Sequence, residues 1–170
     1  IDYSLYATAN FITVTLDGAN PVYVSVDGGD DTRIERIENV TGSAGNDQIT
    51  GDALGNVLRG YIGNDVIDGA DGDDSLYGDA GNDMFIHNLG DDLIDGGSGS
   101  DTLNYSSASN SIQVDLAAGE ALNDGDGGVD TIVSVENVIA TNLNDQLTGS
   151  SASNTLEGRG GNDIIRGGTG

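Results

Sequence analysis

The chain of 170 residues has no cysteine, no tryptophan, one proline, one histidine and only five lysine or arginine residues. Without cysteine it can form neither a disulfide nor a thiolate metal site, so its fold needs another source of stability. Its 29 acidic residues give a formal net charge of −24, which disfavours nucleic acid as a partner because phosphate carries the same sign. No apolar run is long enough to span a membrane.

The chain is rich in glycine and repeats a pattern every nine residues. There are 28 glycines, and the units run without insertion through GSAGNDQIT (42–50), GDALGNVLR, GYIGNDVID, GADGDDSLY, GDAGNDMFI, HNLGDDLID and GGSGSDTLN (96–104). Their apolar residues recur nine apart, at Val40, Ile49, Leu58, Ile67, Leu76, Phe85, Ile94 and Leu103. Two positions before most of these stands Asp or Asn. This unbroken period indicates a repeat architecture.

The spacing suggests both a fold and a ligand. A strand of about three residues and a turn of about six carry the chain half-way round a flat coil, so that residues 18 apart in the sequence lie in adjacent turns. Glycines at the first and fourth positions of a unit permit positive φ angles and leave main-chain carbonyls free to face an ion. The Asp adds a carboxylate, and calcium prefers such oxygen ligands.

The unit resembles the haemolysin-type (RTX) calcium-binding nonapeptide, G-G-x-G-x-D-x-U-x, most closely at 60–68, 69–77, 78–86, 96–104 and 158–166. The resemblance implies an all-β fold, a calcium-dependent parallel β-roll with about five to eight bound Ca²⁺ ions. RTX proteins leave Gram-negative bacteria unfolded through type I secretion machinery. The resemblance therefore also implies a secreted, extracellular protein that has this machinery as a partner.

The 18-residue spacing places the candidate ligands in columns on two edges of the roll. One column holds Asp47, Asp65, Asp83 and Asp101, and the opposite one holds Asn56, Asp74 and Asp92. The next position on the second edge is Asn110, outside any glycine turn, so we expect fewer or weaker sites there. The corresponding residues of the last repeats are Asp145, Asn154 and Asp163. Main-chain carbonyls around Gly45, Gly63, Gly72, Gly81, Gly90, Gly99 and Gly161 would complete the sites. Asp52, Asp79 and Asp95 lie outside the ligand position and are expected to be exposed.

The rest of the chain is a second repeat, about a hundred residues long. Ile12–Leu16 recurs as Ile112–Leu116, and the triplet Glu-Asn-Val at 38–40 recurs at 136–138. We divide the chain into a strand-rich flank (1–41), a first roll block (42–104), a second flank (105–139) and a truncated second block (140–170). Strands are expected at Phe11–Leu16, Val22–Val26, Ile112–Leu116 and Ile132–Val135. We expect the whole to be a piece of a longer protein.

Acidic residues of the flanks are further candidate ligands. Glu38 and Glu136 occupy the ligand position of a unit that precedes the first glycines, above Asn56 and Asn154. We interpret each pair as an end cap, made by a hydrogen bond or by a weaker calcium site. The loops 27–31 and 124–130, with Asp31 and Asp130, lie about one turn before Asp47 and Asp145. Either an irregular calcium ion or a solvated turn accounts for them.

Catalytic motifs are missing, since no G-x-S-x-G elbow, H-E-x-x-H motif or Walker loop occurs. His87 opens the degenerate unit HNLGDDLID, where we expect it to replace a glycine at a kink. We therefore expect no enzyme and no catalytic residue in this segment, whereas a longer parent protein could carry an enzyme domain.

Two functions are compatible with the sequence. The first is a module that is disordered at low calcium and folds outside the cell, because its thin core alone does not offset chain entropy and charge repulsion. Such a module would support the secretion, folding and stability of neighbouring domains. The second is an extracellular adhesion or carbohydrate-binding module that docks on polysaccharide or a cell surface. Tyr61 and Tyr77 alone make a poor aromatic platform for that role.

Overall fold

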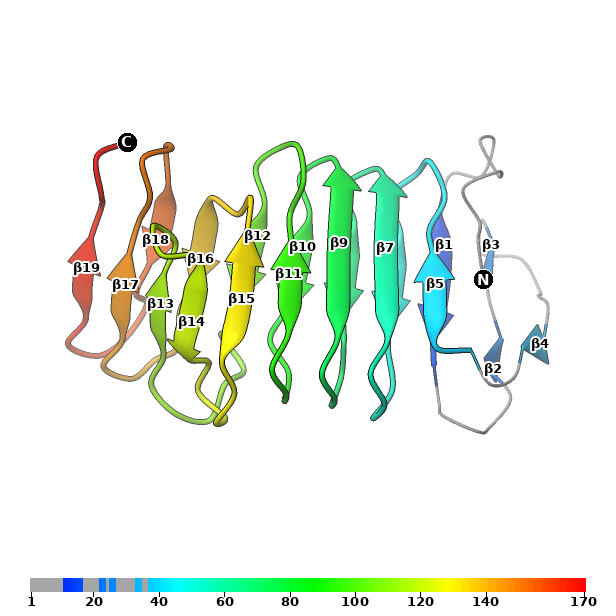
Figure 1. Ribbon diagram of the computed structural model, residues 1–170, viewed down its shortest axis with the longest axis horizontal. Coiled ribbons are helices and arrows are strands. Elements are labelled where there is room, and N and C mark those ends of the chain that lie inside the picture. The colour runs from blue at the N-terminus through cyan, green and yellow to red at the C-terminus, as the bar shows by residue number, and fades with distance from the viewer. Residues whose placement is uncertain (1–10, 17–21, 24, 27–32, 35–36) are drawn as a thin grey trace.

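The computed structural model describes residues 11–16, 22–23, 25–26, 33–34 and 37–170, and within these ranges it contains strands and no helix. The strands form two facing sheets that wind into a flattened roll, with successive turns stacked along its long axis (Figure 1). The all-β parallel roll expected from the nine-residue period is therefore confirmed.

Each sheet takes alternate repeat units. The eight-stranded sheet has the order β18 (Thr155–Glu157), β16 (Asn137–Ile139), β12 (Thr102–Asn104), β10 (Met84–Ile86), β8 (Val66–Asp68), β6 (Gln48–Thr50), β1 (Ile12–Thr15) and β3 (Ser25–Val26). The nine-stranded sheet has the order β19 (Ile164–Arg166), β17 (Gln146–Thr148), β13 (Gln113–Asp115), β14 (Glu120–Asn123), β15 (Asp130–Val133), β11 (Leu93–Asp95), β9 (Ser75–Ala80), β7 (Val57–Ile62) and β5 (Asn39–Thr41). Two further strands, β2 (Val22–Tyr23) and β4 (Arg33–Ile34), pair with each other.

Parallel strands of the first block pair 18 residues apart. Ile49 pairs with Ile67 and Ile67 with Phe85 in one sheet, while Leu58 pairs with Leu76 in the other. In the three-residue strands of this block the middle residue is buried and its neighbours point outward, so the apolar residue of every unit lies in the core. The core is a single row of side chains from each sheet, held between two layers of main-chain hydrogen bonds.

The second flank inserts antiparallel strands into only one of the two sheets. Antiparallel strands β13, β14 and β15 stand between β11 and β17 of the nine-stranded sheet. In the opposite sheet β12 pairs directly with β16, which joins Leu103 to Val138. Both sheets therefore run continuously across the flank. In the eight-stranded sheet the paired residues on its two sides are 35 positions apart in the sequence, instead of the usual 18.

The expected duplication is visible in the pairing of the strands. β1 pairs with β3 antiparallel and with β6 parallel, just as β13 pairs with β14 and β17. The strand predicted over Phe11–Leu16 is β1, the one over Val22–Val26 is divided between β2 and β3, and the ones over Ile112–Leu116 and Ile132–Val135 are β13 and β15. Strands β4 and β14 were not expected, because neither segment alternates over a sufficient length.

We predict that Ile67→Ala lowers the free energy of unfolding by about 2–5 kcal/mol, because the side chain is fully buried in mid-roll and leaves a cavity. Ile165→Ala is the matched control, since Ile165 holds the same position of its unit but is 46% exposed. Urea denaturation of both variants in the same buffer measures the difference. Equal losses would contradict a core made of these register residues.

Candidate metal sites in the turns

The expected columns of acidic side chains are present in the structure. The main-chain N–H of Asp47 donates to Oδ1 of Asp65, Asp65 donates to Asp83 and Asp83 to Asp101, each at 2.8 Å. On the opposite edge Asn56 donates to Asp74 and Asp74 to Asp92 in the same way, at 2.8 and 2.9 Å. In the second block Asp145 donates to Asp163 at 3.0 Å. Each of these carboxylates thus bridges two adjacent turns with one of its oxygens.

Each column continues to a residue that lies more than 18 positions after its last regular member. The N–H of Asp92 donates to Oδ1 of Asp130 at 3.2 Å, so Asp130 and not Asn110 is next on that edge. Asn110 instead donates from its main chain and from Nδ2 to the carbonyl of Gly125, at 3.0 and 2.8 Å. The count of 18 fails here because the strands of the second flank lie between the two turns.

The two flank glutamates differ in their surroundings. The N–H of Asp101 donates to Oε2 of Glu136 at 3.0 Å, and Nδ2 of Asn154 donates to the main-chain carbonyl of Glu136 at 2.9 Å. The expected contact between Glu136 and Asn154 is thus a hydrogen bond, but Glu136 lies inside the column and is not an end cap. Glu38 is exposed, and its carbonyl accepts a bond from Val57. Asp31 and the loop 27–31 lie outside the described residues.

A second ladder runs beside the first, at the fifth position of the units. Here the N–H of the later turn donates back to the side chain of the earlier one: Asn64 to Asn46 and Asn82 to Asn64 at 2.8 Å, and Ser100 to Asn82 at 2.9 Å. The run of Asn before the Asp column was visible in the sequence, but spacing alone gave it no role. The two ladders have opposite directions and fix each turn against both of its neighbours.

Burial makes the columns electrostatically costly. Desolvation, with the charge of neighbouring carboxylates added to it, raises the pKa of Asp65 and Asp92 to about 7 and that of Asp74 and Asp101 to about 6. Desolvation also raises the pKa of Asp47 and Asp83. Arg59 carries a positive charge, but this charge is paired with Asp79 outside the columns, at 2.5 Å from Nη1 to Oδ1, and its guanidinium stacks over Tyr77. A bound cation would therefore supply the positive charge that a buried carboxylate column requires.

Among the described residues, five carboxylate oxygens are buried and have no hydrogen-bond donor: one lies in the second flank, at Oδ2 of Asp124, and four lie in turns of the two columns, at Oδ2 of Asp65, Asp74, Asp83 and Asp101. In each of these turns the second residue of the unit has a positive φ angle, at Tyr61, Ala70, Asp79 and Gly97. A Cβ on the first glycine of each unit would collide with this oxygen. At Gly78 it would also meet the main-chain carbonyl of Gly96, one turn later. Such a Cβ would also meet the carbonyl of Gly78 at Gly60 and that of Ser134 at Gly96, whereas at Gly69 it would meet Nδ2 of Asn88. The first glycine therefore keeps a small cradle open beside the carboxylate oxygen, and a carbonyl borders this cradle in three of the four turns. Gly42 and Gly51 are crowded in the same way, so what distinguishes the four turns is the donor-free oxygen. We call these four the open turns.

Other turns satisfy the side-chain oxygen at the same position with donors of the protein, although Nδ2 of Asn56 is buried without a partner among the described residues. Asp47 accepts bonds from the N–H and the hydroxyl of Ser43, at 2.6 and 2.8 Å, and from the N–H of Ile12 at 2.6 Å. Asp145 is bound in the same way by Thr141 and by the N–H of Ile112. Asn56 and Asn154 accept from the N–H of the second residue of their units, Asp52 and Ser150. We call these four the closed turns, and none of their second residues has a positive φ angle.

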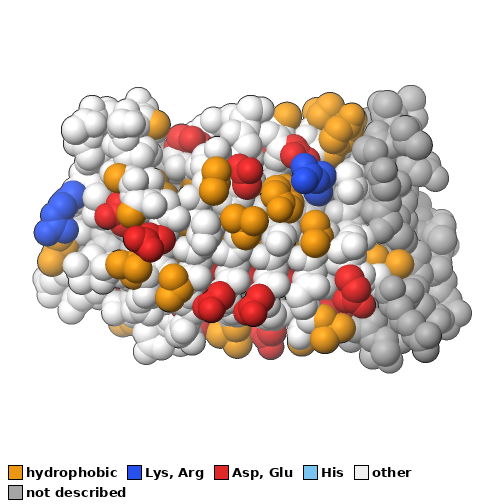
Figure 2. Space-filling model, viewed as in Figure 1, with side chains coloured by type: hydrophobic (Ala, Val, Ile, Leu, Met, Phe, Trp, Pro, Cys, Tyr) orange, Lys and Arg blue, Asp and Glu red, His pale blue; other side chains and the backbone are white. Residues whose placement is uncertain are grey.

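Several acidic side chains outside the ligand position are less exposed than expected. Asp52 is buried and accepts a bond from the N–H of Leu54 at 2.9 Å, so its predicted exposure is wrong. Asp79 and Asp95 are half-buried. On the outer face of the nine-stranded sheet, acidic and apolar side chains are interspersed and basic ones are sparse (Figure 2).

The donor set of the open turns fits a hard cation. It consists of carboxylate and carbonyl oxygens, the ligands that calcium takes in shells of six to eight. Within the described ranges no three Asp, Glu or His side chains are grouped so that they could hold a metal by themselves. Main-chain carbonyls, of which the turns offer many, would therefore have to complete a calcium shell. Among the described residues there is no helix that is long and apolar enough to cross a membrane.

Comparison with known families gives one match. The model of the RTX calcium-binding nonapeptide repeat matches four segments, 35–53, 51–85, 88–112 and 139–170, which together cover more than half of the chain. All four open turns lie within these segments. No curated protein matches the chain.

The raised pKa values predict how the metal-free roll responds to pH. A carboxyl whose folded-state pKa lies above its ordinary value of 3.8 stabilises the fold fully at pH values below 3.8, and this stabilisation is lost as pH rises through about 6 to 7. In a chelator, we expect circular dichroism to show more β-structure at pH 5.5 than at pH 8, and a smaller difference between the two pH values for Asp65→Asn. More β-structure at pH 8 than at pH 5.5 in the chelator would contradict the burial of these carboxylates.

Proposed function

Since the chain belongs to the RTX calcium-binding nonapeptide repeat family, we propose that calcium binds in its open turns and that this binding drives the folding of the roll. The observation that carries the proposal is the buried, donor-free Oδ2 of Asp65, Asp74, Asp83 and Asp101. Each of these oxygens would be a calcium ligand, and main-chain carbonyls of the same and the next turn would supply others. The ion would supply the charge that stabilises two ionised carboxylates in adjacent turns.

Asp163 is included as a further ligand because its turn has the backbone of the open turns, although its Oδ2 is not among the buried, donor-free oxygens. Arg159, the second residue of its unit, has a positive φ angle, and a Cβ on Gly158 would collide with Oδ2 of Asp163. The closed turns play a different part in the proposal. Their Asp47, Asn56, Asp145 and Asn154 side chains already accept the bonds that calcium would replace, so these turns form without the ion.

Folding is coupled to calcium because the roll has little else to hold it together. Its core receives one apolar side chain per nine residues, and its net charge is −24. For a site with a dissociation constant of roughly 10⁻⁴ to 10⁻³ M, millimolar calcium contributes on the order of 0.4 to 1.4 kcal/mol. Several such sites reach a sizeable part of a domain's marginal stability of roughly 5 to 15 kcal/mol. At submicromolar calcium the contribution vanishes.

This dependence suits a chain that is exported before it folds. In a cytosol of low calcium the repeats stay disordered and can pass through type I secretion machinery, and outside the cell millimolar calcium folds them. The folded roll then supports neighbouring domains of a longer extracellular protein. The closed turns at Ser43 and Thr141 give each block a first turn that forms without calcium.

The alternative role as a carbohydrate-binding module has less support. Stacking on a sugar needs free aromatic faces, but one face of the Tyr77 ring is covered by the guanidinium of Arg59, 4.4 Å from the ring centroid. Tyr61 is 36% exposed and provides a single ring.

We predict that the wild-type chain gains β-structure when a chelated sample is titrated with calcium to millimolar concentration, as measured by circular dichroism. Asp83→Asn should move the midpoint to several-fold higher calcium, because one cradle loses its charged ligand. Asp95→Asn removes the same charge from a half-buried side chain outside the cradles and should leave the midpoint unchanged. Equal β-structure with and without calcium would refute coupled folding, and equal midpoints for the two variants would refute the open turns as sites.

A further inference from the structure

The second flank contains a nonapeptide that the family match does not include. Residues 125–133 read GDGGVDTIV and lie between the matched segments 88–112 and 139–170. They have Gly at the first and fourth positions of the unit, Asp at the sixth and Ile at the eighth. The inserted strands β13 and β14 displace this unit from the nine-residue register that starts at Val40. Counting in steps of nine from Val40 therefore does not find it.

The structure makes these residues one more unit of the roll, stacked on the unit 87–95. Ile132 pairs with Ile94, and the N–H of Asp92 donates to Oδ1 of Asp130 as in the regular columns. The ladder at the fifth position continues too, because the N–H of Val129 donates to Asp91 at 2.9 Å. A Cβ on Gly128 would collide with the carbonyl of Gly90, as one on Gly90 would with that of Gly72.

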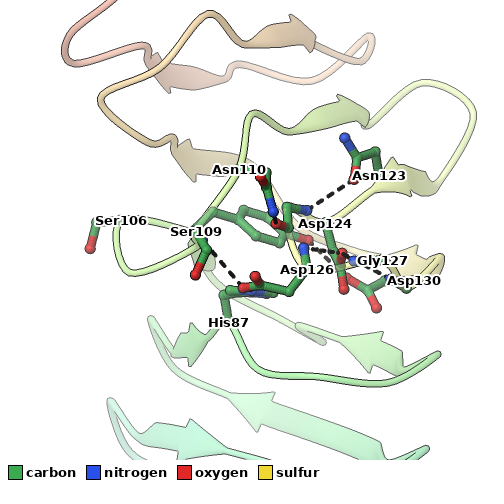
Figure 3. Close-up of polar contacts among 12 residues, drawn as sticks. His87, Ser106, Ser109, Asn110, Asn123, Asp124, Asp126, Gly127 and Asp130 are labelled. Carbon is green, nitrogen blue, oxygen red and sulfur yellow. Dashed lines mark hydrogen bonds and ion pairs between the residues drawn. The ribbon is translucent and has the colours of Figure 1, made fainter.

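The carboxylates of this turn are arranged differently from those of the open turns. Both oxygens of Asp130 have donors, because the hydroxyl of Tyr105 donates to Oδ2 at 3.1 Å. Asp124, directly before the unit, is fully buried, and its Oδ1 accepts the N–H groups of residues 126, 127 and 128 at 2.9 to 3.0 Å (Figure 3). Its Oδ2 is buried and has no donor among the described residues.

This free oxygen of Asp124 faces a carbonyl. An ideal Cβ on Gly128 would lie 2.6 Å from Oδ2 of Asp124 and would collide with the carbonyl oxygen of Gly90. The two oxygens therefore border the same small space, which glycine keeps open. In the open turns, Gly60, Gly78 and Gly96 likewise lie between a donor-free carboxylate oxygen and a main-chain carbonyl of an adjacent turn.

As far as the structure describes the chain, the surroundings are acidic and contain no positive charge directed at Asp124. Asp92 and Asp130 have a raised pKa, mainly because of burial, and the charge of Asp124 raises both further. The nearby basic group is His87, whose Nε2 lies 2.8 Å from Oδ2 of Asp126 and whose ring lies 5.2 Å from that of Tyr105. His87 thus holds the tip of the loop in place by pairing with Asp126 and not with Asp124 (Figure 3).

We propose that Asp124 Oδ2 and the Gly90 carbonyl bind a calcium ion, with further main-chain carbonyls completing its shell, and that this ion fastens the second flank to the first block. The inference rests on the proposed function, since it assumes that the open turns bind calcium. It adds a site whose ligand comes from outside the nonapeptide. The ion would join a loop of the second flank to a repeat of the first block, where hairpin strands interrupt the parallel stacking.

The test counts calcium ions bound to the full chain by isothermal titration. Asp124→Asn should bind one ion fewer than the wild type, because the amide oxygen is a weaker ligand without charge. Asp126→Asn is the matched control: it makes the same change two residues away, at a side chain engaged by His87 and Ser109, and should bind the wild-type number. Circular dichroism in calcium confirms that both variants are folded.

A second readout does not depend on the stability of the Asp124 variant. Tyr105, whose hydroxyl contacts Asp130, should sensitise the luminescence of a terbium ion bound in place of calcium. Tyr105→Phe should lose that part of the luminescence and keep the number of bound ions.

The outcomes separate the two proposals. If the wild type binds calcium but folded Asp124→Asn binds the same number, or if Tyr105→Phe keeps the full luminescence, the additional site is overturned and the proposed function stands. If the wild type binds no calcium, the proposed function fails as well.

Discussion

Buried carboxylates stacked one above another are the constraint on which the rest of this structure depends. A nine-residue unit repeated in a two-sheet roll brings the same Asp to the same place every second unit, with its charge removed from water. Each carboxylate receives one main-chain N–H from the preceding turn, and this bond satisfies one oxygen. The second oxygen and the remaining charge require a hydrogen-bond donor or a cation, and the turns differ in which of the two they can provide.

The conformation of one residue separates the two solutions. Where the second residue of the unit has a positive φ angle, as at Tyr61 and Asp79, its N–H does not reach the carboxylate and the oxygen is left for an ion. Where it has a negative one, as at Ser43 and Thr141, its N–H and hydroxyl donate to the carboxylate directly. The same backbone roll can therefore contain calcium-dependent and calcium-independent turns. The first Asp of each block is of the second kind, which suits the place where a stack of turns begins.

Much of this arrangement could be predicted from the sequence, because a strict period converts directly into three-dimensional register. The buried row of apolar residues, the 18-residue pairing and the column from Asp47 to Asp101 follow from the count alone. The count failed at the second flank, where Asp130 and Glu136 replace the expected neighbours, since only the structure shows how many residues an insertion occupies. The unit at 125–133 has the glycines, the Asp and the apolar residue of the nonapeptide, and comparing every segment of nine residues with that pattern would have found it.

The saturated carboxylates were harder to foresee. Asp47 and Asp65 look alike in the sequence, and they differ in the hydrogen bonds of a single turn. Ser43 and Thr141 are the signals that could have separated them, because a short hydroxyl side chain four residues before an Asp can cap its carboxylate. The positive φ angles at Tyr61, Ala70 and Asp79 had no such signal, since residues other than glycine rarely adopt them.

An anomalous difference map from crystals grown in calcium tests the central claim most directly, because it locates ions independently of affinity. The account predicts density beside Oδ2 of Asp65, Asp74, Asp83 and Asp101, and no density beside the capped carboxylates of Asp47 and Asp145. Density of equal height at Asp47 and Asp65, or none at Asp65, would contradict the division of the roll into open and closed turns.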